Sequence, residues 1–160
     1  MNVAIERSIA DRRGFRLVTE LHVREPREQV FEFFSDAHQL EAITPPWLHF
    51  SVQTPAPITM HSGALIDYRL RLHGFPVHWK SRISLWQPPT QFVDEQVKGP
   101  YCYWRHEHTF ESTDVGTLVR DVVHYAVPLS LVVHPFFVRR DLIRIFEFRR
   151  AVMRRMFTPA

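Results

Sequence analysis

Two histidines are the residues of this chain best placed to do chemistry. His106 and His108 lie two positions apart in the segment 101–111, whose alternation is typical of a β-strand, so both side chains lie on one face of that strand. Apolar Trp104 and Phe110 share this face, and charged residues occupy the other, which indicates that the histidines point inward. A one-residue bulge in this segment would reverse that orientation.

An inward-facing pair of imidazoles has three interpretations. The first is a metal site, which would need a third ligand such as Asp121 or His124 on the next strand. The second is acid–base chemistry, because the ordinary histidine pKa lies near neutrality. The third, which we favour, is that the histidines line a pocket as polar groups satisfied by neighbours or water. We therefore assign no catalytic residue and predict no metal and no cofactor.

A carboxylate and a guanidinium on two other segments have the same inward orientation. Asp121 lies on a largely apolar face of the strand predicted over 116–127, and Arg149 lies inside the apolar arc of the segment 137–157. Burial disfavours an isolated carboxylate, so Asp121 needs a partner, and Arg149 is the natural one. Either the two form a structural ion pair, or Arg149 binds a carboxylate or carbonyl of a ligand.

Aromatic side chains supply further candidates, although core packing is the default for each in a chain with 13 Phe. Tyr68 lies on an apolar strand face and could offer its hydroxyl to a ligand. The complete set of predicted ligand-binding residues is Arg149, Asp121, His106, His108, Tyr68, Trp104, Trp47, Tyr125 and Ile145.

The elements that must position these residues follow from periodicity. The segment 137–157 contains no Pro or Gly and is apolar on one helical face, so it predicts a long helix that needs a sheet to lie on. Segments with the alternation of strands precede it, and prolines and glycines separate them. The predicted strands are 15–23, 48–53, 63–72, 77–86, 92–97, 101–111 and 116–127, with two short helices over 26–35 and 38–43.

This segregated order predicts an α+β fold with an antiparallel sheet. Residues 1–14 are polar and aperiodic, so we expect a loose leader there and a single domain over 15–160. A length of 160 residues, with 45% hydrophobic and 23% charged residues, suits one such domain.

Charge and cysteine content narrow the classes of function. The net charge of +3 is mildly basic, but much of the excess lies on the polar face of the last helix, so we expect no nucleic-acid binding. The single cysteine, Cys102, rules out an internal disulfide and fits a reducing compartment. No segment resembles a signal peptide or is apolar enough to cross a bilayer, so we expect a cytoplasmic protein without integral membrane contact.

The order of elements and several short motifs resemble the START-like superfamily, also called SRPBCC or Bet v 1-like, and its bacterial polyketide-cyclase-like branch. The matching stretches are Pro26 with Val30-Phe31 and Phe33-Phe34, Thr44-Pro45-Pro46-Trp47, Gly99-Pro100-Tyr101 with Trp104, His106, His108 and Phe110, Gly116-Thr117 with Asp121, Val123, Tyr125 and Val127-Pro128, and Phe148-Arg149-Arg150. The resemblance implies a helix-grip fold, in which a curved antiparallel sheet of six or seven strands wraps the C-terminal helix. It also implies a cavity between the two, with Trp47 in a loop that flanks the cavity mouth.

Members of this superfamily mostly bind lipids, polyketides or other apolar molecules, and some are cyclases or dehydratases. We therefore predict binding of a small, mostly apolar ligand by a monomer or homodimer. The alternative is a cyclase, dehydratase or isomerase that acts on a carbonyl compound in the same cavity. A third hypothesis is an interaction module whose basic helix face docks on an acidic partner or a membrane surface.

Overall fold

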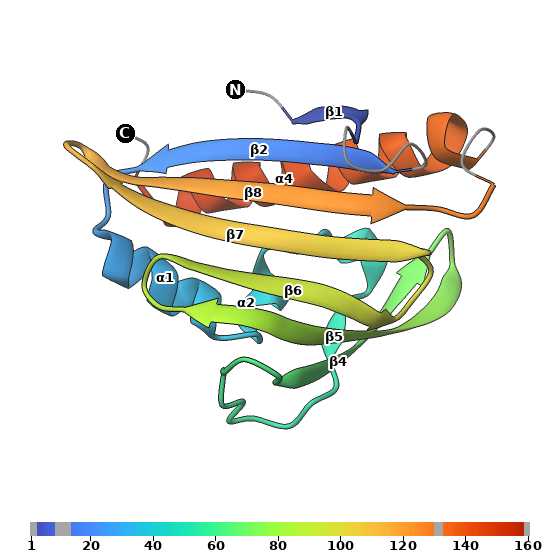
Figure 1. The fold of residues 1–160 in the computed structure, drawn as a ribbon, viewed down its shortest axis with the longest axis horizontal. Helices are drawn as coiled ribbons and strands as arrows, with labels where there is room; N and C mark the ends of the chain where they lie inside the picture. Colours follow the sequence, from blue (N-terminus) through green and yellow to red (C-terminus); the bar gives the residue numbers. More distant parts are fainter. Residues whose placement is uncertain (1–2, 9–13, 130–132, 159–160) are drawn as a thin grey trace.

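The computed structural model describes residues 3–8, 14–129 and 133–158 of the chain. In this part of the chain an antiparallel sheet of eight strands, in the order β1-β2-β8-β7-β6-β5-β4-β3, curves around a long C-terminal helix (Figure 1). The predicted α+β arrangement is therefore confirmed, with one or two more strands than the six or seven we expected. The strands are β1 (Ala4–Arg7), β2 (Phe15–Val23), β3 (Ser51–Val52), β4 (Leu65–Leu72), β5 (Phe75–Gln87), β6 (Gln91–Lys98), β7 (Tyr103–Thr113) and β8 (Gly116–Ala126).

Two short helices follow β2, as predicted, and the long helix closes the chain. The helical elements are α1 (Arg27–Ser35), α2 (Gln39–Ala42), the 3₁₀ turn η1 (Pro46–Leu48), the π-helical stretch η2 (His134–Val138) and α4 (Arg139–Met156). Proline explains η1, because two consecutive prolines fix φ and remove backbone donors, which excludes a longer strand here. Of the strand predicted over 48–53, only Ser51–Val52 pairs in the sheet.

The first strand corrects one expectation. Ala4–Arg7 lies in the segment predicted as a loose leader, yet it pairs antiparallel with β2, with Ile5 opposite Leu17. The prediction was wrong for these four residues, and residues 1, 2 and 9–13 of the leader lie outside the described part of the chain. An edge strand needs only backbone groups to pair, and most β1 side chains are exposed, so no alternation marked it in the sequence.

Strand register fixes which side chains share the inner face at the centre of the sheet. The pairing of β7 with β8 runs without a bulge, and it sets His108 opposite Asp121. The pairing of β6 with β7 sets Asp94 opposite His106. Residues directly opposite in an antiparallel pair lie on one face with their Cβ atoms about 4.5–5.5 Å apart. Three strands thus bring these four side chains together on the buried face.

Helix α4 lies beside β1 and β2 and buries its apolar arc against the sheet (Figure 1). Leu142 and Phe146 join one hydrophobic cluster with Leu17 and Tyr125, and Met153 joins a second cluster that includes α1. The helix begins beside an internal anchor, in which buried His134 stacks on Phe15 and its Nε2 lies 2.8 Å from the Tyr125 hydroxyl.

Two methionines on α4 test how much the helix face contributes to stability. Met153→Ala removes a side chain that is 2% exposed, and we expect it to lower the free energy of unfolding by about 2–5 kcal/mol, through lost burial and a cavity. Met156→Ala is the matched control, because Met156 is 46% exposed and its loss should change stability by no more than about 0.5 kcal/mol. Urea denaturation of both variants gives the comparison, and equal effects would contradict the orientation of α4.

The anchor at His134 predicts a pH dependence. Burial, and secondarily the charge of Arg139, lower the pKa of His134 from 6.5 to about 4. As the pH falls through this window the unfolded chain takes up a proton at this residue and the folded chain does not, so stability falls. The variant His134→Phe keeps the stacking on Phe15 but cannot titrate. Its stability should therefore fall less steeply than that of the wild type between pH 6.5 and about 4. Parallel stability curves would show that His134 does not titrate this way.

Candidate functional site

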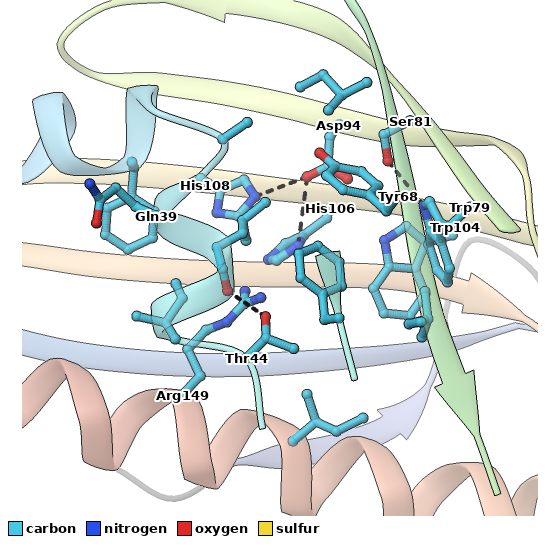
Figure 2. Close-up of a pocket in the computed structure, with 18 of the residues that line it drawn as sticks. Gln39, Thr44, Tyr68, Trp79, Ser81, Asp94, Trp104, His106, His108 and Arg149 are labelled. Atoms are coloured by element: carbon cyan, nitrogen blue, oxygen red, sulfur yellow. Dashed lines mark hydrogen bonds and ion pairs between the residues drawn. The ribbon is translucent and has the colours of Figure 1, made fainter. Parts of the chain in front are cut away.

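A cavity of about 170 Å³ lies between the inner face of the sheet, the α1–α2 segment and α4. Its wall is mostly apolar and aromatic, with few polar groups. Those polar groups come from separate elements and converge on the same space, as Figure 2 shows for Gln39, Thr44, Tyr68, Ser81, Asp94, His106, His108 and Arg149. An apolar cavity with a few convergent polar groups is the usual form of a small-molecule site.

The volume limits the size of an occupant. Pockets for drug-sized ligands span roughly 300–1,000 Å³, and this cavity is smaller at about 170 Å³. In the conformation described, the cavity therefore suits a small ligand, of the size of one or two rings or a short acyl chain.

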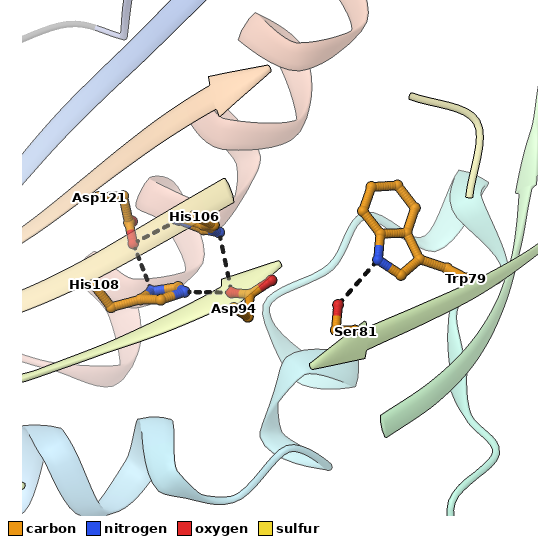
Figure 3. Close-up of polar contacts among 6 residues, drawn as sticks. All are labelled: Trp79, Ser81, Asp94, His106, His108 and Asp121. Carbon is orange, nitrogen blue, oxygen red and sulfur yellow. Dashed lines mark hydrogen bonds and ion pairs between the residues drawn. The ribbon is translucent and has the colours of Figure 1, made fainter. Parts of the chain in front are cut away.

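Four ionisable side chains from β6, β7 and β8 form one network at the cavity wall, which we call the His–Asp tetrad: Asp94, His106, His108 and Asp121. The well-formed hydrogen bonds join His106 Nε2 to Asp121 Oδ1 at 3.1 Å and His108 Nε2 to Asp94 Oδ2 at 3.0 Å (Figure 3). Two ionic contacts close the ring, from His106 Nδ1 to Asp94 Oδ2 at 3.7 Å and from His108 Nδ1 to Asp121 Oδ1 at 2.8 Å. The last contact lies off the direction of a hydrogen bond.

Each imidazole therefore lies between two carboxylates, and the pKa values follow from that arrangement. Burial alone would raise the pKa of Asp121, but the hydrogen bond from His106, the close contact with His108 and the charges of both histidines outweigh it and hold that pKa far below its ordinary value. Burial alone would raise the pKa of Asp94 too, and the hydrogen bond from His108 and the charges of both histidines lower it. Both carboxylates are thus ionised at neutral pH.

The two histidines differ from each other. Burial and the charge of His108 lower the pKa of His106, whereas at His108 the two carboxylates outweigh burial and raise the pKa. Their ring centroids are 3.8 Å apart, so two positive charges would repel strongly. The tetrad can therefore hold one extra proton, and His108 holds it more readily than His106.

Arg149 reaches the cavity from α4, as its place in the apolar arc predicted. Its guanidinium carbon lies 5.2 Å from the centre of the Phe146 ring. Its Nε and Nη1 atoms are buried, and neither has a hydrogen-bond partner among the described residues. A buried donor without a partner costs about 1–3 kcal/mol, more for a charged group. These two N–H groups are therefore a strong candidate for contact with a ligand acceptor.

The predicted ligand-binding residues divide into two groups. Six of them line the cavity: Arg149, His106, His108, Tyr68, Trp104 and Ile145. Three others do not line it: Asp121, Trp47 and Tyr125. Asp121 lies behind the histidines, and Tyr125 directs its hydroxyl to His134. The inward orientation predicted for the β7 histidines is confirmed by their burial.

In the structure, Asp121 does not have the partner that we expected. We weighed an ion pair between Asp121 and Arg149, but the described contacts of Asp121 are with the two histidines. Trp47 remains 46% exposed, packs edge-on against Phe148 and lies under the Arg144 guanidinium. It therefore lies outside the cavity wall, and its role at the cavity mouth stays a prediction.

Sequence reasoning missed Asp94. In its segment Asp94 lies two residues from Phe92, so the pair shares a face, but Glu95 follows directly, and two adjacent acidic residues in a short strand do not indicate which of them is buried. Its importance comes from the register that sets it opposite His106. Only the pairing of β6 with β7 shows that relation.

A family model described as "Polyketide cyclase / dehydrase and lipid transport" matches residues 23–146. The chain belongs to this family. The match runs from the last residue of β2 to the first half of α4 and thus includes all of the tetrad, although it ends before Arg149. No protein of curated function matches the sequence.

Solved structures that are similar to this member of the polyketide cyclase, dehydrase and lipid-transport family show the same fold. A Chromobacterium violaceum protein superposes with a TM-score of 0.69 at 11% identity, over 91% of this chain and 99% of its own. Ginseng (Panax ginseng) major latex-like protein 151 gives a TM-score of 0.69 at 12% identity, over 92% of this chain and 99% of its own.

A third similar structure is the di-domain ARO/CYC protein StfQ of the steffimycin biosynthetic pathway. It gives a TM-score of 0.67 at 12% identity, over 87% of this chain and 49% of its own. These likenesses establish the helix-grip fold. Within the described part of the chain, no helix is both long and apolar enough to span a bilayer.

The tetrad gives a stability prediction. Asp121→Asn removes a buried charge that both histidines contact, and we expect it to lower the free energy of unfolding by about 3–5 kcal/mol. Asp114→Asn makes the same chemical change at an exposed residue and should alter stability by less than about 0.5 kcal/mol. Urea unfolding followed by tryptophan fluorescence measures both. A stability loss as small as that of the control would contradict the pairing described for Asp121.

Proposed function

We propose that this protein binds a small, mostly apolar molecule with a carboxylate or carbonyl end in the cavity between the sheet and α4. The observation that carries the proposal is that two guanidinium N–H groups of Arg149 have no hydrogen-bond partner among the described residues, in an otherwise mostly apolar cavity. An apolar body contributes affinity at about 25 cal/mol per Å² of buried surface. The guanidinium adds orientation, because each of these N–H groups can donate a charge-assisted hydrogen bond to a ligand oxygen.

The family supports this proposal, since its description names lipid transport together with polyketide cyclase and dehydrase activity. The polar end of the ligand would lie near the tetrad, because Arg149 is close enough for its charge to act on the pKa values of Asp94 and Tyr68, lowering both. In this arrangement Trp104 and Ile145 contact the apolar body of the ligand. A cytoplasmic location and a monomeric or homodimeric state stay predictions.

A cyclase, dehydratase or isomerase is the second candidate, and the tetrad is the observation that favours it. A histidine held between two carboxylates can take a proton from a carbon next to a carbonyl and return it elsewhere. Burial raises the pKa of Tyr68, so its hydroxyl stays protonated and can donate a hydrogen bond to the developing enolate. Arg149 would stabilise the same negative charge.

The interaction-module hypothesis ranks third. Helix α4 buries Leu142, Phe146 and Met153 against the rest of the protein, so its apolar arc is not free for a partner. Its exposed face carries arginines that contribute to the net charge of +3. Association through this face would be salt-sensitive and unaffected by changes in the cavity.

Native mass spectrometry of protein purified from its own host, before and after mild organic extraction, tests ligand binding. We expect a discrete extra mass that extraction removes. Arg149→Met keeps most of the side-chain volume and removes the charge, so the amount of retained ligand should fall at least about tenfold, the effect of losing about 1.4 kcal/mol. Arg154→Met, an exposed residue of the same helix, is the matched control and should retain the ligand.

The outcomes separate the candidates. Equal ligand retention by Arg149→Met and the wild type would contradict the role of Arg149. A wild-type protein that carries no ligand but converts a carbonyl compound, with loss of turnover in Arg149→Met, would favour the enzyme. Circular dichroism of both variants shows whether the fold is intact.

A further inference from the structure

The tetrad contains the donor set of a metal centre, which goes beyond the binding of an organic ligand. One donor atom each from Asp94, His106 and His108 lie within 4.8 Å of one another. Asp94 Oδ2 is 3.0 Å from His108 Nε2 and 3.7 Å from His106 Nδ1. Two ligands of a tetrahedral zinc ion, each about 2.0–2.1 Å from the metal, lie about 3.3 Å apart. The two measured spacings lie on either side of that value, so small side-chain movements would complete the coordination.

Asp121 supplies the support that metal-binding histidines usually have. Its Oδ1 lies 3.1 Å from His106 Nε2 and 2.8 Å from His108 Nδ1, which are the ring nitrogens turned away from Asp94. A ligating histidine commonly donates its other N–H to a carboxylate, and this contact fixes the tautomer and the orientation of the ring. Here a single carboxylate contacts both rings from behind, so the nitrogens near Asp94 can both serve as ligands.

Electrostatics also favour a cation at this point. A neutral imidazole with its proton on the nitrogen that faces Asp121 directs the lone pair of its other nitrogen at the Asp94 carboxylate, and two such contacts in a buried site are unfavourable without a positive charge between them. The hydrogen bond between His108 Nε2 and Asp94 Oδ2, 3.0 Å long, spans the position that the metal would take. The positive charge of Arg149 opposes a dication nearby, and the two ionised carboxylates offset it.

We propose that Asp94, His106 and His108 bind one divalent transition-metal ion, with zinc the best match for two imidazoles and one carboxylate. Asp121 is a positioning residue in this site. The three ligands all line the cavity, so the fourth coordination position faces it. A three-ligand site of this kind leaves room for water or for an oxygen of a bound molecule, which the metal polarises.

This proposal revises two expectations from the sequence. We expected no metal site, and among possible third ligands we considered Asp121 and His124. In the structure Asp121 lies behind the histidines, and His124, on β8, is opposite Arg105 on the other face of the sheet. Asp94, two strands away from Asp121, is the third ligand that the register supplies.

Metal titration of the chelator-treated full-length protein tests the site. Zinc is added in competition with a chromophoric chelator, and cobalt(II) is added separately as a spectroscopic probe. We expect one equivalent of either metal to bind, and cobalt to show the intense visible absorption of four- or five-coordinate sites with nitrogen ligands. Absence of binding to the wild type, or a spectrum of six-coordinate hydrated cobalt, would overturn the proposal.

Variants assign the metal to these residues. Asp94→Asn removes a charged ligand and should weaken zinc binding at least about tenfold, and Asp121→Asn should weaken it about 10–100-fold through the histidine orientation. His124→Gln is the control, because it removes a histidine from the adjacent strand outside the site, and its affinity should equal that of the wild type. Unchanged affinity in Asp94→Asn, or a loss in His124→Gln, would place the metal elsewhere among the 10 histidines.

One readout needs no variant and remains informative if Asp94→Asn fails to fold. Nitrogen NMR of the histidine rings in the wild type should show zinc-dependent shifts at His106 Nδ1 and His108 Nε2, with their partner nitrogens protonated. Shifts confined to other histidines would contradict the assignment. The NMR result does not depend on which organic molecule the cavity binds. A negative result would therefore contradict the metal site and leave the proposed function unaffected.

Discussion

The structure depends on the constraint that charges cannot be buried alone. Asp121, His106 and His108 are each no more than 5% exposed, and leaving any of them without a partner would cost several kcal/mol. The register of β6, β7 and β8 solves this by setting each histidine between two carboxylates. The sheet must therefore keep this register to keep the charges paired.

Helix α4 has the complementary role. Its apolar arc closes the cavity opposite the strands and contributes one charged side chain, Arg149, whose donors are not used within the described structure. The tetrad charges of the sheet thus contact one another, whereas Nε and Nη1 of Arg149 on the helix have no hydrogen-bond partner among the described residues. This difference is why we assign the ligand contact to Arg149 and the proton or metal chemistry to the tetrad.

The candidate functions share one site and differ in what the tetrad does there. In a binding protein it is a polar wall that orients a ligand, and in a cyclase or isomerase it moves a proton. With a metal ion it becomes a Lewis acid that faces the same cavity. Membership of the polyketide cyclase, dehydrase and lipid-transport family is compatible with each of these, because the family description spans transport and catalysis. The small cavity, about 170 Å³, restricts all of them to a small organic partner.

The sequence by itself determined the local features. Alternation in the β7 segment predicted that His106 and His108 point inward, and helical periodicity predicted the same for Arg149, because period 2 and period 3.6 report the buried face directly. The tertiary structure alone decided the partners. Asp94 became part of the site, and Asp121 paired with the histidines, through strand register, which depends on turn lengths and pairing between segments distant in sequence. Periodicity reports which face a side chain takes, and only the folded sheet sets what lies opposite it.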